Sequence, residues 1–80
     1  MDWRDRIDSD PDVIGGKLRI KGTRIGVALL LRFFAAGWTE KQVLESYPHL
    51  TPDDLKAVFA FSAEAADDTF LISRNRPAAA

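Results

Sequence analysis

The chain has 80 residues and a mass of 8.9 kDa, and its Lys, Arg, Asp and Glu give a net charge of −1 at pH 7. This length allows one small domain, and the lack of cysteine excludes disulfides and cysteine-based zinc sites. The longest apolar stretch, residues 25–38, is shorter than the roughly 20 residues of a membrane span. We therefore expect a soluble cytoplasmic protein with one domain over residues 1–72 and a mobile tail over residues 73–80.

The first third of the chain predicts short strands separated by glycine turns. Residues 18–21 alternate between apolar and basic side chains, which is typical of a half-buried strand. Residues 6–8 predict another short strand, and residues 24–25 can pair back across the turn that begins at Gly22. Strands this short are not stable alone, so they must pack against helices.

Three helices are predicted after the strands. The first covers residues 27–36. Thr39 and Gln42 have the spacing of a capping box and predict the start of the second helix. Thr51 is suited to cap the third helix, with Pro52 in its first turn.

Together these elements predict an α+β fold that is mainly α, with a short N-terminal β element followed by three helices. The last two helices resemble a helix-turn-helix pair. The second helix of that pair begins with Asp53 and Asp54, which would repel DNA phosphates. We therefore expect the pair to serve packing first and base reading second.

The first helix is apolar on nearly every side, which predicts that it is buried on all sides. The core of so short a chain is too small to cover it, so we expect a homodimer. The predicted interface residues are Val27, Leu30, Leu31, Phe34 and Phe61.

Positive charge is concentrated in residues 13–32, which carry Lys and Arg but no Asp or Glu. Such a segment can contact an anion such as nucleic acid, or it can pair with the chain's own acids. Arg24 in particular can bind phosphate or brace its own turn, since both use the same donors. The candidate DNA-binding residues are Lys17, Arg19, Lys21 and Arg24.

Catalytic and metal chemistry finds little support in the sequence. The only histidine, His49, lies in a turn and has no cysteine to activate. The acidic run at residues 8–12 lacks the glycine and glutamate that a calcium loop requires. We expect a protein that is not an enzyme and has no cofactor or metal site.

Residues 16–27 read Gly16-Lys17-Leu18-Arg19-Ile20-Lys21-Gly22-Thr23-Arg24-Ile25-Gly26-Val27. This segment resembles the motif Gly-Lys-Pro-x-Ile-x-Gly-Thr-Arg-Ile-Pro-Val of the small bacterial domain-of-unknown-function 433 family. The resemblance covers about residues 7–65 and continues through residues 47–50, Tyr-Pro-His-Leu. Leu18 and Gly26 stand where the family has proline.

The family resembles VapB-type antitoxins with a homeodomain-like helical part. The resemblance therefore implies an antitoxin of a type II toxin–antitoxin system, which neutralises a PIN-like ribonuclease toxin and binds its own operator DNA. The alternatives are a stand-alone DNA-binding transcriptional regulator and a structural oligomerisation module.

The tail offers a candidate toxin contact. An apolar trio precedes two arginines, which can pair with the carboxylates of a nuclease site. The alternative is that the trio completes the chain's own core. The residues concerned are Phe70, Leu71, Ile72, Arg74 and Arg76.

Overall fold

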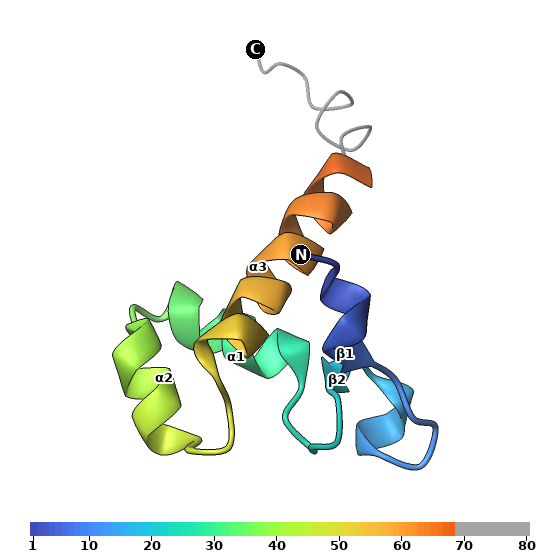
Figure 1. Cartoon of the computed structure of the whole chain (residues 1–80), viewed down its shortest axis with the longest axis horizontal. Coiled ribbons are helices and arrows are strands. Elements are labelled where there is room, and N and C mark those ends of the chain that lie inside the picture. The colour runs from blue at the N-terminus through green and yellow to red at the C-terminus, as the bar shows by residue number, and fades with distance from the viewer. Residues whose placement is uncertain (69–80) are drawn as a thin grey trace.

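The computed structural model describes residues 1–68, which form a mainly helical fold with a short two-stranded hairpin followed by three helices (Figure 1). This confirms the predicted fold class. The strands and helices are β1 (Ile7–Asp8), β2 (Arg19–Ile20), α1 (Val27–Ala35), α2 (Glu40–Ser46) and α3 (Pro52–Asp68). Two short 3-10 helices at Trp3–Asp5 and Ile14–Gly16 precede β1 and β2 respectively.

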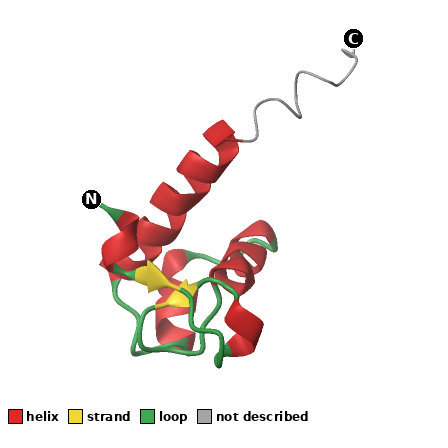
Figure 2. Cartoon of the chain, turned by 90° about the vertical axis from the view of Figure 1, so that its right-hand side faces the viewer, coloured by secondary structure: helices red, strands yellow, loops and turns green. Residues whose placement is uncertain are grey.

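The hairpin brings two apolar side chains into the core. β1 and β2 pair antiparallel, with Ile7 opposite Ile20 and Asp8 opposite Arg19. Ile7 and Ile20 are both buried. The chain then turns back as predicted, and the Ile20 N–H donates to the Ile25 carbonyl at 3.0 Å. Figure 2 shows the small sheet in the middle of the body, among the helices.

The caps of α1 and α2 follow the predicted local chemistry. Gly37, just after α1, has a φ of +95°, which favours glycine. The Gln42 N–H donates to Thr39 Oγ1 at 3.1 Å, and the Thr39 N–H donates to Gln42 Oε1 at 2.8 Å. The predicted capping box at the start of α2 is therefore confirmed.

The start of α3 is capped reciprocally and is also bound by the N-terminal segment. The Asp54 N–H donates to Thr51 Oγ1 at 3.2 Å, and the Thr51 N–H donates to Asp54 Oδ2 at 2.9 Å. Asp54 is only 7% exposed, and its other oxygen accepts from Arg6 Nη1 at 3.0 Å. A buried carboxylate needs such partners, so Arg6 and the cap together keep Asp54 in place.

The N-terminal 3-10 helix packs along α3 beyond this point. The Trp3 ring meets the Phe61 ring edge-on at 5.1 Å, and Arg4 Nη2 donates to Glu64 Oε2 at 2.9 Å. The C-terminal turns of α3 extend away from the rest of the body (Figures 1 and 2). The first residues of the chain therefore support the helix that ends the described part.

Helix α1 is covered largely by its own chain, which corrects part of the expected dimer interface. Val27 and Leu30 are 2% and 0% exposed, so both belong to the chain's own core, and Val27 also borders an apolar groove. Phe33 stacks on Trp38 at 4.3 Å, which shields another side of the helix. The sequence pattern of α1 does not show that Trp38 and Phe59, from outside this helix, contact Phe33 and Phe34. The buried apolar core consists of Ile7, Ile20, Val27, Leu30, Val43, Leu50, Leu55, Ala57 and Val58.

Replacing Asp54 should destabilise the chain far more than replacing its neighbour. Asp54→Ala should lower the free energy of unfolding by about 2–3 kcal/mol, because Arg6 and the Thr51 N–H lose their partner. Asp53 is exposed and lies 3.6 Å from Arg6, so Asp53→Ala should cost less than about 0.5 kcal/mol. Urea unfolding of both variants measures the difference, and equal losses would contradict the assigned role of Asp54.

Restoring the family's proline at position 26 should stabilise the chain. Gly26 has φ −75° and ψ 144°, and its N–H donates no hydrogen bond within residues 1–68. A Cβ added there meets Ile14 Cδ1 at an ordinary 3.4 Å. Gly26→Pro should therefore raise the free energy of unfolding by about 0.5–1 kcal/mol through a less flexible unfolded state.

Gly22→Pro is the matched control, because Gly22 has a φ of +76° that proline cannot adopt. Thermal unfolding of both variants should show a raised midpoint for Gly26→Pro and a lowered one for Gly22→Pro. A lowered midpoint for Gly26→Pro would show that the ring is not accommodated.

Candidate anion-binding surface

The turn after β2 is held in one conformation by Thr23. Its Oγ1 donates to the Ile20 carbonyl at 2.7 Å and accepts from the Ile25 N–H at 3.0 Å. Gly22 supplies the positive φ that the turn needs. The Thr23 side chain therefore caps the turn, and the turn presents Arg24 to solvent.

Arg19 braces this turn from the hairpin. Its Nε donates to Asp8 Oδ1 at 2.9 Å, and its Nη1 donates to the Thr23 carbonyl at 3.1 Å. Its Nη2 lies 4.0 Å from Asp10 Oδ2. The hydrogen bond that Arg19 donates to Asp8 raises the pKa of Arg19 above its usual value. Only 14% of the Arg19 side chain is exposed, so we remove it from the candidate DNA contacts because its donors serve the fold.

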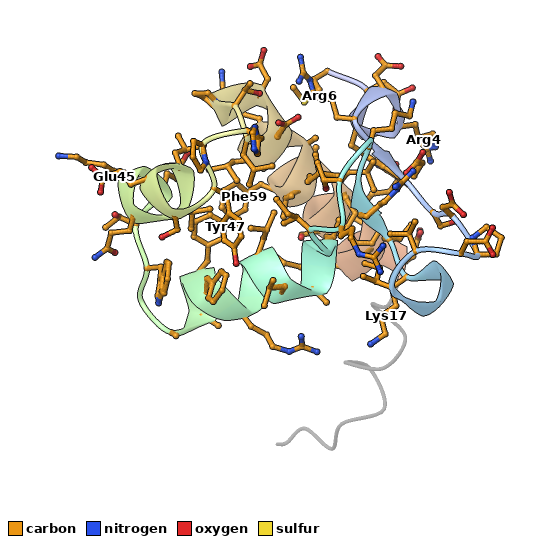
Figure 3. The ribbon with its side chains drawn as sticks, turned by 90° about the horizontal axis from the view of Figure 1, so that it is seen from below. Arg4, Arg6, Lys17, Glu45, Tyr47 and Phe59 are labelled. Atoms are coloured by element: carbon orange, nitrogen blue, oxygen red, sulfur yellow. The ribbon has the colours of Figure 1, made fainter. Side chains whose placement is uncertain are left out.

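The other predicted DNA-binding residues differ in whether their side chains are bound by the chain itself. Lys21 Nζ donates to the Arg4 carbonyl at 3.3 Å. Lys17 and Arg24 are exposed, and their side chains make no hydrogen bond or ion pair within residues 1–68. The bracing role considered for Arg24 in the sequence therefore belongs to Arg19. Figure 3 shows Lys17 pointing away from the body.

A third unpaired cation, Arg32, joins this surface and was missed in the sequence. Arg32 lines the same small hollow as Lys17 and Arg24, with a volume of about 190 Å³. Leu18 and Leu29 form part of its apolar wall. The signal for Arg32 was its place in the acid-free stretch, one turn before the end of α1.

An apolar groove lies beside these cations, between α1, α3 and the segment before β2. Its volume is about 270 Å³, and its lining includes Lys17, Leu18 and Ala28. Leu31 and Phe61, two predicted interface residues, also line it. Phe34, the remaining predicted interface residue outside the core, instead meets Phe59 with ring centroids 5.0 Å apart.

A larger hollow of about 520 Å³ opens on the other side of Arg24. It is lined by residues 22–25 and by His49. The turn that carries His49 is closed by the Leu50 N–H, which donates to the Tyr47 carbonyl at 2.9 Å. Two segments of the family motif, distant in sequence, therefore meet at one hollow.

The predicted toxin contacts cannot be placed in the described part, and residues 1–68 show neither a metal cluster nor a membrane-spanning helix. Residues 1–68 contain no group of three His, Cys, Asp or Glu side chains placed to hold a metal ion. Within the same residues, no helix has the length and apolar character that crossing a membrane requires. The predicted toxin contacts Phe70, Leu71, Ile72, Arg74 and Arg76 lie outside the described residues.

Comparison with known proteins identifies the family. Residues 7–62 match the family described as "Protein of unknown function (DUF433)". The fold is similar to the crystal structure of a DUF433 member protein from Anabaena variabilis, with a TM-score of 0.73 and 35% sequence identity. That match covers 79% of this chain and 62% of the Anabaena protein, and no curated protein matches the chain. Because the family match spans most of the chain and includes both turns at the larger hollow, the chain belongs to the DUF433 family.

Proposed function

We propose that this chain is a non-catalytic antitoxin of a type II toxin–antitoxin system that binds and neutralises a PIN-like ribonuclease. The observation that carries the proposal is the group of unpaired cations, Lys17, Arg24 and Arg32, which line one small hollow with an apolar wall. A nuclease of this kind holds its metal with carboxylates, so it offers the acidic surface that these cations fit.

The mixture of apolar and cationic side chains favours a protein partner over DNA. Protein interfaces combine an apolar centre with a polar rim, and the small hollow has this composition, since Leu18 and Leu29 lie beside its three cations. A DNA interface needs cations along a phosphate backbone, and two features reduce that fit. Arg19 is occupied by Asp8, and the start of α3 is acidic.

Operator DNA binding stays part of the proposal, and a stand-alone transcriptional regulator is the alternative. Lys17, Lys21 and Arg24 remain as exposed candidate phosphate contacts near the hairpin. A homodimer would present each of them twice. The two functions differ in their partner, since a regulator without a toxin would bind DNA with a steep salt dependence and capture no nuclease.

The partner can be tested by co-expressing the full chain with the product of the adjacent reading frame. The two proteins should co-purify, and the antitoxin should suppress the ribonuclease activity of its partner. Arg24→Ala combined with Arg32→Ala should weaken binding about tenfold or more, because two charged contacts are lost. Lys41, an exposed cation on α2 without an ion pair in residues 1–68, provides the control Lys41→Ala. Failure to co-purify, or full binding by the double variant, would contradict the proposal.

We further propose that the chain is a homodimer whose interface includes Leu31 and Phe61 in the apolar groove. Light scattering at micromolar concentration should report a mass near twice 8.9 kDa. Leu31→Glu should yield a folded monomer, because a charge in the groove opposes its burial. Phe59 is 41% exposed outside the groove, so Phe59→Glu should stay dimeric. A wild-type monomer, or dissociation by Phe59→Glu alone, would contradict this interface.

A further inference from the structure

We propose that the hollow between the Gly22–Ile25 turn and His49 is a binding site for a phosphate group, with Arg24 and His49 as its two donors. This hollow has a volume of about 520 Å³, and no carboxylate is among its lining residues. An Arg and a His that share an acid-free hollow provide N–H donors to an anion from two sides.

The backbone turn that carries Arg24 is held in one conformation by hydrogen bonds. Thr23 uses its hydroxyl for two hydrogen bonds within the turn, and its carbonyl accepts from Arg19. Arg19 is in turn fixed by Asp8 at 2.9 Å. The backbone beneath Arg24 is therefore anchored to the hairpin, so binding an anion there needs little ordering of the chain.

The His49 wall is anchored to a different part of the fold. Leu50 is 5% exposed in the core, and its N–H closes the turn by donating to the Tyr47 carbonyl at 2.9 Å. Pro48 precedes His49 and restricts the backbone of the turn. Two residues after His49 comes Thr51, the cap of α3, which Asp54 and Arg6 hold in place.

Neither donor is committed to the protein itself. Arg24 and His49 are exposed, and the side chain of neither makes a hydrogen bond or an ion pair within residues 1–68. The guanidinium presents a planar set of N–H donors, and an imidazole carries at least one N–H in either protonation state. Ile25 contributes an apolar wall, which limits water around the bound group.

Phosphate can reach such a site as a free monoester or as part of a nucleic-acid backbone. The shared chemistry is an anionic tetrahedral group with several acceptor oxygens, which suits Arg and His donors. The antitoxin proposal shares Arg24 with this site but does not use His49, and its other cations, Lys17 and Arg32, lie outside the hollow. His49→Ala therefore separates the two proposals.

The test is a titration of the full chain, labelled with 15N, with inorganic phosphate at constant ionic strength. We expect saturable shifts of the amide signals of residues 22–25 and 49. Arg24→Ala and His49→Ala should each weaken phosphate binding about fivefold or more, since each removes a charge-assisted or oriented donor. The controls Arg32→Ala and Lys41→Ala should bind within about twofold of the wild type, because both residues lie outside the hollow.

A short oligothymidylate, titrated in the same way, identifies the source of the phosphate. Shifts at the same residues with both probes would support a phosphodiester backbone, and shifts with inorganic phosphate alone would support a monoester. The proposal would be overturned if neither probe gives saturable shifts at the hollow. It would also be overturned if Lys41→Ala weakens binding as much as His49→Ala does. Unfolding midpoints equal to that of the wild type verify that the variants fold.

Discussion

The contact between Arg6 and Asp54 holds together the two halves of this small fold. Arg6 directly precedes strand β1, and Asp54 lies in the first turn of α3. The same carboxylate accepts from the Thr51 N–H, so one buried group fixes a helix cap and the hairpin at once. A buried carboxylate destabilises the fold when it has no partner, and it favours one geometry when its partners are in place. The Gly22 turn after the hairpin and the His49 turn before Thr51 depend on it for their relative position.

The cations of residues 1–68 differ in whether a carboxylate lies within reach of their side chains. Arg4, Arg6 and Arg19 each meet a carboxylate of the N-terminal segment or of α3. Lys17, Arg24 and Arg32 belong to the stretch of residues 13–39, which contains no acid, and they have no such partner in the described part. The nearly neutral total charge therefore conceals a local surplus of positive charge that ion pairs within residues 1–68 leave available.

Short-range sequence patterns predicted the caps and turns of the secondary structure well. They could not predict contacts between residues that are distant in the sequence. Thr39 with Gln42, Gly22 and Thr51 act within a few residues, so their caps and turns could be predicted from spacing alone. The role of Arg19 could not be predicted, because spacing does not say that Asp8 lies opposite it in the hairpin. The hollow beside Arg24 was missed for the same reason, since His49 reaches it only through the packing of Leu50.

The N-terminal segment contacts residues that are far along the chain, so these contacts can form only after α3 has been synthesised. Arg6 and Arg4 bind residues that follow them by 48 and 60 positions. During synthesis the chain emerges from its N-terminus, so these arginines leave the ribosome well before Asp54 and Glu64 exist. The hairpin cannot gain its anchor on α3 until most of the chain has been translated. The contacts of Arg4 and Arg6 with α3 are therefore formed late, and a chain truncated before α3 lacks the partners of both arginines.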